Sequence, residues 1–306
     1  MNTNKNPGIT RREFFRSGVL LGSAVAVSGI YQTGAAAHEI RHPVAHFKVS
    51  CAAYSYRKYL KSGEMNLFDF INRCVDMDID AVELTSYYFP EKITNAYLNE
   101  LKRKTFLHGL DISGTAIANN FCVPPGEKRD KEIEHVKKWI DYAAGFSAPC
   151  IRIFAGNPEK GVSQSQAIQW SADAIKTCLD YAGKRGVFLA LENHGGIVAR
   201  AAVLKTICDK VGFHPWFGVN LDTGNFRTDP YGDMQLIAPY AITVQVKDWV
   251  TAPDGKTRQE ANLKKVLDIL RAANYRGYLA LEYEGKEDPK TGVPKWIARL
   301  KEEAYK

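Results

Sequence analysis

Polar residues stand at the ends of four apolar runs in the second half of the sequence, and their types could support acid–base or metal chemistry. The residues concerned are Glu192, Asp222, Lys247 and Glu282. Carboxylates that are brought together repel strongly unless a positive charge lies between them. A divalent cation would meet that need with the fewest groups. For each acid taken alone, the alternative is a solvated carboxylate or a cap for the next helix.

Neighbours of these positions share their face if the runs are strands, because side chains alternate along a strand. The alternation places His194 with Glu192, Asn220 with Asp222, Gln245 with Lys247, and Glu284 with Glu282. His194 could contact a substrate or support a ligand, and the alternative is an ordinary structural hydrogen bond.

The elements that would position these residues follow a regular alternation. Eight β-branched or aromatic runs lie near residues 47–56, 81–88, 111–118, 150–155, 187–193, 217–223, 242–248 and 277–283. Between them apolar residues recur at helical spacing, as at Ile168, Ala172, Ile175 and Leu179. Strands that alternate with helices indicate a parallel α/β sheet.

Eight such units in one domain favour closure into a (β/α)₈ TIM barrel. A doubly wound sheet would give the same alternation, but no G-x-G-x-x-G follows the first run and the chain has no G-x-x-x-x-G-K-[ST]. Residues at the carboxyl ends of barrel strands build the active site in this fold. The four polar positions would therefore meet at one mouth.

The N-terminus carries an export signal by its pattern. Arg11 and Arg12 form a twin-arginine motif, an apolar run follows over residues 18–29, and an A-x-A cleavage site ends at Ala37. The run is shorter than the roughly 20 residues that span a bilayer. We therefore expect a signal peptide over residues 1–37, a periplasmic mature protein over residues 38–306, and one domain in that mature chain.

Charge and cysteine usage argue against a nucleic-acid-binding protein, a membrane-surface protein and a disulfide-stabilised fold. Removing four basic residues and one acidic residue with the signal lowers the formal net charge from +7 to +4. No Lys/Arg block is present, so neither nucleic acid nor a membrane surface is expected as a partner. The six scattered cysteines indicate buried apolar positions rather than structural disulfides. A homo-oligomer stays open.

The strand-end sequences resemble the sugar phosphate isomerase/epimerase family of the xylose isomerase-like TIM barrel superfamily. The motifs are Leu-Glu-Asn-His at 191–194, Asn-Leu-Asp-Thr-Gly-Asn at 220–225, Val-Lys-Asp at 246–248 and Leu-Glu-Tyr-Glu-Gly at 281–285. The likeness extends forward to Ala-Val-Glu-Leu at 81–84 and Ile-Arg-Ile at 151–153. The order and spacing of these motifs carry the resemblance over most of the mature chain.

The resemblance implies one divalent cation held by Glu192, Asp222 and Glu282. The fourth ligand position in the family is the His of a His-x-Lys-Asp run, and here it is Gln245. Without that nitrogen donor the set is all oxygen, which favours Mn²⁺ or Mg²⁺ over Zn²⁺ or Co²⁺.

The resemblance further implies an enzyme, an isomerase or epimerase that moves a proton on the carbon next to a carbonyl, with Glu192 and Glu282 as the acid–base pair. Candidates for contacts with a small carbohydrate substrate are Arg152, His194, Asn225, Lys247, Trp249 and Tyr54. For the two cations the alternative is a salt bridge, and for the aromatic residues it is packing.

The expected substrate is a free sugar, keto-sugar or glycoside, because exported proteins meet few sugar phosphates and no Gly-rich phosphate loop is evident. Two other functions stay open. One is a lyase or hydratase that acts on oxidised glycosides, since removal of the same proton can expel a β-substituent. The other is a carbohydrate-binding barrel without chemistry, for which Gln245 is the hint.

Overall fold

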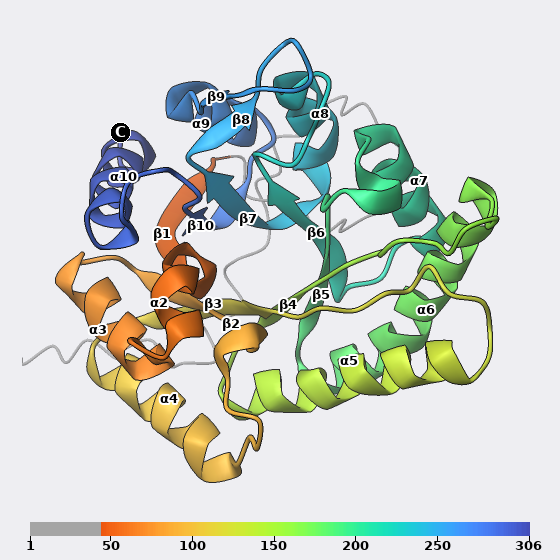
Figure 1. Ribbon diagram of the computed structural model, residues 1–306, viewed down its shortest axis with the longest axis horizontal. Coiled ribbons are helices and arrows are strands. Elements are labelled where there is room, and N and C mark those ends of the chain that lie inside the picture. The colour runs from red at the N-terminus through yellow and green to blue at the C-terminus, as the bar shows by residue number, and fades with distance from the viewer. Residues whose placement is uncertain (1–43) are drawn as a thin grey trace, which may run out of the picture. The chain divides into compact units, whose positions relative to one another are not determined.

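The computed structural model describes residues 44–306, which form a closed barrel of parallel strands surrounded by helices (Figure 1). The order around the barrel is β1, β10, β7, β6, β5, β4, β3 and β2, so the first and last barrel strands pair with each other. The barrel strands are β1 (His46–Ala52), β2 (Ala81–Thr85), β3 (Asp111–Ala116), β4 (Cys150–Ile153), β5 (Phe188–Glu192), β6 (Phe217–Asp222), β7 (Ala241–Lys247) and β10 (Arg276–Glu282). The predicted (β/α)₈ barrel is confirmed. The predicted signal peptide lies outside the described residues.

Helices lie around the outside of the barrel and join successive strands (Figure 1). They are α2 (Arg57–Ser62), α3 (Leu67–Asp76), α4 (Asn95–Leu107), α5 (Glu127–Gly145), α6 (Gln164–Arg185), α7 (Ala201–Val211), α8 (Pro230–Ile237), α9 (Leu263–Ala272) and α10 (Pro289–Ala304). Local sequence sets their ends. Ser163 and Gln166 form a capping box at the start of α6, and Gly186 ends it with a positive φ of 69°.

Each predicted strand run contains a barrel strand, but two runs continue into a short helical turn. The turns are Ala53–Tyr56 after β1 and Ser86–Tyr88 after β2. In the first turn the Ser55 hydroxyl donates to the Leu281 carbonyl at 2.8 Å and accepts from the Tyr283 amide at 2.9 Å. The Ser55 side chain therefore makes the hydrogen bonds to the β10 backbone that a neighbouring strand would otherwise make.

A hairpin that the sequence pattern did not predict follows β7 directly. It consists of β8 (Trp249–Thr251) and β9 (Arg258–Glu260), which pair antiparallel apart from the barrel sheet (Figure 1). Both strands have only three residues, too few for a period-2 pattern to be distinctive. The hairpin leaves from the end of a barrel strand, which is where the predicted site residues lie.

The barrel interior contains small side chains below the mouth. Ser50 of β1 and Ser113 of β3 are buried, and their hydroxyl oxygens lie 2.9 Å apart. The cysteines are buried and carry free thiols. Within residues 44–306, no helix combines the length and apolar character needed to cross a membrane.

Candidate active site at the barrel mouth

The predicted acids meet at the carboxyl ends of neighbouring barrel strands. Strand register places Glu192 of β5 opposite Asn220 of β6, and Asp222 of β6 opposite Gln245 of β7. Glu282 of β10 lies opposite Lys247. All of these residues are buried. The parallel barrel therefore brings together residues that are up to 90 positions apart in the sequence.

Glu192 is held by an arginine and an amide. One carboxylate oxygen, Oε2, lies 2.9 Å from Arg152 Nε, and Oε1 accepts from Asn225 Nδ2 at 2.9 Å. Burial raises the pKa of Glu192 to about 7, against the opposing charge of Arg152, and the charge of Glu282 raises it further. Glu192 therefore titrates near neutral pH in this arrangement.

Arg152 and His194 form the wall beside Glu192. Arg152 Nη1 donates to the Ile117 carbonyl at 2.7 Å, and the guanidinium lies 3.9 Å from the centre of the Phe154 ring. The same Phe154 ring also packs against His194, and the two ring centres lie 4.2 Å apart. His194 stands at the rim, and the loss of solvent on its packed face, then the charge of Arg152, lower its pKa to about 4. The imidazole is therefore neutral at pH 7.

Lys247 lies among three carboxylates. Its ammonium nitrogen is 3.0 Å from Glu282 Oε1, 2.8 Å from Glu284 Oε1 and 3.4 Å from Asp222 Oδ2. Burial lowers the pKa of Lys247, but the three negative charges outweigh this and hold the pKa well above its usual value. Gly224 gives the lysine stem room, since a Cβ there would lie 2.6 Å from Lys247 Cγ.

Asp222 has one satisfied and one unsatisfied oxygen. Its Oδ1 accepts from the backbone amides of Gly224 at 2.8 Å and Asn225 at 3.1 Å. Its Oδ2 is buried and has no hydrogen-bond partner, with the Lys247 ammonium 3.4 Å away. Burial raises the pKa of Asp222 well above its usual value despite Lys247, and the charges of Glu282 and Glu192 add to the rise.

A layer of amides and one carboxylate lies beneath these charges. Gln245 Nε2 donates to Glu83 Oε1 at 2.8 Å, and Gln245 Oε1 accepts from Asn220 Nδ2 at 2.7 Å. Glu83 is 3% exposed, and burial, then the charge of Glu282, raises its pKa to about 7. Each end of the Gln245 amide therefore has one partner, and its oxygen has a second lone pair that can accept another.

The two predicted aromatic contacts differ in position. The Tyr54 ring centre lies 5.8 Å from the Lys247 ammonium nitrogen. The Trp249 ring packs 3.5 Å from the Arg258 guanidinium of the hairpin, and Arg258 Nη2 lies 3.1 Å from Glu284 Oε2. Tyr54 therefore lies near Lys247 at the centre of the mouth, whereas Trp249 is connected to it through Arg258 and Glu284.

Three further polar residues of the mouth, Glu83, Asn220 and Glu284, were not among the predicted site residues. Glu83 is a single acid within the buried strand β2, and this placement was the available signal. The alternation of side chains did place Asn220 and Glu284 on the face of Asp222 and Glu282, two residues away, but it assigned them no role.

The donor chemistry of the mouth fits a divalent cation. Carboxylates outnumber cations there, all donors are oxygens, and Asp222 Oδ2 lacks a hydrogen-bond partner. Within residues 44–306, however, no three His, Cys, Asp or Glu side chains already stand close enough to hold an ion. Lys247 occupies the space between Asp222 and Glu282, so its ammonium would have to move for a cation to reach both.

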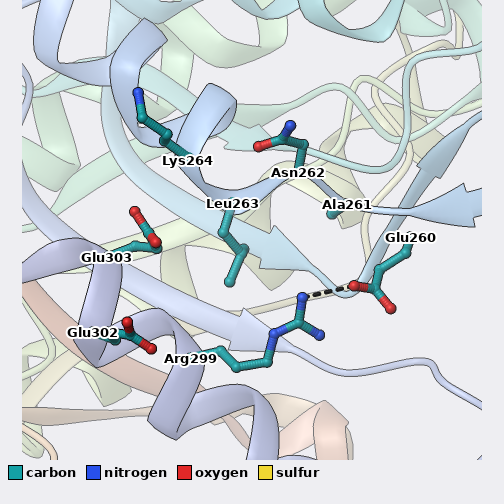
Figure 2. A pocket seen from close by; sticks show the side chains of 8 residues that line it. All are labelled: Glu260, Ala261, Asn262, Leu263, Lys264, Arg299, Glu302 and Glu303. Carbon is teal, nitrogen blue, oxygen red and sulfur yellow. Dashed lines mark hydrogen bonds and ion pairs between the residues drawn. The ribbon is translucent and has the colours of Figure 1, made fainter.

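A surface hollow of about 390 Å³ lies away from this mouth, between β9, α9 and α10 (Figure 2). Glu260 and Arg299 form an ion pair on its wall, as the dashed line in Figure 2 marks. None of the predicted site residues lines it. The candidate chemistry therefore stays with the barrel mouth.

Solved structures with the same fold include sugar-processing proteins. The IOLI protein with a zinc atom has a TM-score of 0.69 and 18% identity, over 84% of this chain and 96% of its own. D-Psicose 3-epimerase with D-tagatose from Clostridium cellulolyticum H10 has a TM-score of 0.65 and 15% identity, over 84% and 95%. A sugar phosphate isomerase/epimerase from Parabacteroides distasonis ATCC 8503 has a TM-score of 0.63 and 17% identity, over 84% and 94%. At these identities the likeness shows the fold.

A family model matches most of the chain, whereas individual curated sequences do not match it. None of the curated protein sequences compared with the chain matches it. The family model described as Xylose isomerase-like TIM barrel matches residues 71–303, from α3 into α10. With the closed parallel barrel and the acids at its mouth, this match shows that the chain belongs to the xylose isomerase-like TIM barrel family.

Proposed function

We propose that this protein is a sugar isomerase or epimerase that moves a proton on the carbon next to a carbonyl. The observation that carries the proposal is the pair of buried glutamates at one mouth, each of which forms an ion pair with a buried cation. Glu192 lies against Arg152 and Glu282 lies against Lys247. Two carboxylates at one substrate position can remove a proton and return it.

Glu192 is suited to proton transfer at neutral pH. A general base works best when its pKa lies near the working pH, and the pKa of Glu192 is raised to about 7. Asn225 fixes the carboxylate through Oε1, and Arg152 fixes it through Oε2. In this proposal Glu192 exchanges the proton on one side of the substrate carbon and Glu282 on the other.

Lys247 and Arg152 are proposed to bind the substrate oxygens. Both are buried and keep their charge, since nearby carboxylates raise the pKa of each. Negative charge that develops on a carbonyl oxygen during proton removal is stabilised by such fixed donors. His194 is neutral and can donate to or accept from a sugar hydroxyl, and Tyr54 offers an aromatic face to the ring.

We also propose one divalent cation, held by Glu192, Asp222 and Glu282 with the amide oxygen of Gln245. When bound, the cation would polarise the substrate carbonyl and the neighbouring hydroxyl. The oxygen-only donor set favours Mn²⁺ or Mg²⁺ over Zn²⁺ or Co²⁺. The family's solved relatives, one with a zinc atom, support metal dependence as a proposal.

The proposed substrate is a free sugar, keto-sugar or glycoside. A structural relative is a D-psicose 3-epimerase with D-tagatose, which supports a small carbohydrate as the substrate class. We also propose that the mature protein starts near His38 and acts in the periplasm. N-terminal sequencing of the exported protein tests this, and export that is unimpaired when Arg11 and Arg12 are both lysine would contradict it.

Deuterium exchange tests the reaction. Incubated in D₂O with Mn²⁺ and a panel of ketoses and keto-glycosides, the enzyme should place deuterium on the carbon next to the carbonyl. Glu282→Gln should lower the exchange by about 10²- to 10⁴-fold, the usual range for a lost acid or base. Tyr278→Phe is the matched control, because it changes the opposite end of the same strand, and it should leave the exchange unchanged.

Product analysis separates the outcomes. A product with the same composition as the substrate supports isomerisation or epimerisation, and loss of a β-substituent would assign a lyase or hydratase instead. Conversion without exchange or loss of the α-proton would falsify the proton-transfer proposal. Saturable sugar binding without any conversion would indicate a carbohydrate-binding barrel.

A further inference from the structure

We propose that Glu83 is a positioning residue that fixes the Gln245 amide with its oxygen available to a cation at the mouth. The inference rests on the proposed cation and adds a residue outside its ligand set. Glu83 lies on β2, on the far side of the barrel from β6 in strand order. It is 3% exposed, and its only hydrogen-bonded side chain is Gln245 within residues 44–306.

The hydrogen bonds determine which way the amide points. In its ionised form the Glu83 carboxylate only accepts, so the amide group of Gln245 that lies 2.8 Å from Glu83 Oε1 is then the NH₂ group. The amide oxygen is then directed away from Glu83 and accepts from Asn220 Nδ2 at 2.7 Å. Without Glu83 the amide could rotate by half a turn and present its nitrogen, which cannot ligate a cation.

The same constraint passes to Asn220. Because its NH₂ group is used by Gln245, its own oxygen, Oδ1, is the free end of that amide. This oxygen is buried and has no hydrogen-bond partner, and Asp222 Oδ2, on the same face of β6, is in the same state. One carboxylate on β2 therefore sets two amides in series and leaves acceptor oxygens next to Asp222.

The arrangement explains how an amide can stand where relatives of this kind carry a histidine. A histidine ring presents a nitrogen lone pair whose direction is fixed by the ring, whereas an amide needs a partner to select its oxygen. Partners of this type strengthen ligands, and their loss usually weakens metal binding by about 10- to 100-fold. Glu83 is proposed to supply that selection for Gln245.

Titration of the purified, chelator-treated full-length protein with Mn²⁺ by calorimetry tests the proposal. Glu83→Gln should weaken Mn²⁺ binding by about 10- to 100-fold, because the new amide no longer dictates the orientation of Gln245. Glu83→Asp keeps the charge but shortens the side chain, and it should also weaken binding. Ser113→Ala is the control, since it removes a buried hydrogen bond of the same barrel interior away from Gln245.

A double-mutant cycle separates positioning from loss of charge. In the Gln245→Ala background there is no amide to orient, so adding Glu83→Gln should cost little further affinity. An equal loss in both backgrounds would mean that Glu83 acts through its charge alone, and this would overturn the proposal. Unchanged Mn²⁺ affinity in both Glu83 variants would overturn it too.

The outcome also distinguishes this inference from the proposed function. If the unmodified protein binds Mn²⁺ and exchanges deuterium but the Glu83 variants behave like it, only the positioning role fails. If the unmodified protein binds no Mn²⁺ at all, the cation and the positioning role both fail. Should Glu83→Gln not fold, as judged by circular dichroism, Glu83→Asp carries the test.

Discussion

The two ends of the barrel differ in the polarity of the side chains that line them. At the carboxyl ends of the strands the interior holds buried charges, with Lys247 among three acids and Arg152 against Glu192. At the amino ends a hollow of about 590 Å³ is lined mostly by apolar groups such as Phe188, Trp216 and Ile242. The difference shows that charge is concentrated at the mouth, at a cost in stability, whereas the amino ends surround an apolar hollow.

The first way to test this contrast is to remove the central cation of the mouth. Lys247→Met leaves Asp222, Glu282 and Glu284 without their ammonium partner. In chelator-treated protein the free energy of unfolding should fall by about 3–5 kcal/mol, as is usual when one member of a buried ion pair is lost. Urea unfolding measures this.

The control is an exposed ion pair on a helix. Lys205→Met removes the contact with Asp209 on α7, and exposed pairs at this spacing are worth about 0.3–0.5 kcal/mol. Mn²⁺ should restore more stability to Lys247→Met than to the unmodified protein. In the variant the metal ion can occupy the space between Asp222 and Glu282 that the ammonium group has left. A variant as stable as the unmodified protein without metal would contradict the view that Lys247 balances the mouth.

The second test uses pH. Burial raises the pKa of Glu83 and of Glu192 to about 7, against about 4.3 in an unfolded chain. Between these values the folded protein holds protons that the unfolded chain has released, so raising the pH removes stability. In metal-free protein the free energy of unfolding should therefore fall between pH 5 and pH 8, by about 2.5 kcal/mol for each of the two groups.

Glu192→Gln sharpens this second test, since the amide cannot ionise. The variant should lose part of the decline with pH, because one of the two groups no longer titrates. At pH 8 it also leaves Arg152 without its ion-pair partner, so no gain in stability over the unmodified protein is expected there. Urea unfolding at pH 5.5 and pH 8 in the presence of EDTA measures the decline in both proteins. Stability that rises over this range, with the same slope in the variant, would show that the mouth acids are not strained by burial.

The third and smallest effect belongs to the opposite end. Register slips between β6 and β7 near Val219, so that Ile242 is an extra residue on β7 and sits over Gly218. A Cβ at Gly218 would lie 2.5 Å from Ile242 Cγ2. Gly218→Ala should lower the free energy of unfolding by about 1–3 kcal/mol through overcrowding and leave kcat within about twofold. A large loss of kcat would show that the two ends are coupled.

Sequence patterns predict the barrel because strand and helix periods are local properties of the chain. Each predicted run contains a barrel strand, and the acids do stand at the strand ends. The contact between Glu83 and Gln245 joins residues 162 positions apart, and no local period reports such a pairing. A salt bridge was the alternative role predicted for Lys247, and the structure shows one, but its three carboxylate partners could not be named from a local pattern. The catalytic roles and the cation stay predictions.

The hairpin and the export signal are two further features for which prediction from sequence was incomplete or is untested. β8 and β9 are too short for their period to be distinctive, so Arg258 could not be placed over Trp249 from sequence. The twin-arginine segment lies outside residues 44–306, and its function stays a prediction that rests on Arg11 and Arg12, the apolar run at 18–29 and the cleavage site that ends at Ala37.

The buried free thiols can report local unfolding of the helices around the barrel. Burial raises the pKa of Cys178 in α6 and of Cys208 in α7 to about 12, so almost no reactive thiolate exists while those helices stay packed. An alkylating reagent added to the native protein therefore reads how often each helix detaches, without any engineered label. Since α6 and α7 connect the strands that carry Arg152, Glu192 and Asp222, labelling kinetics would follow the scaffold of the mouth independently of any substrate.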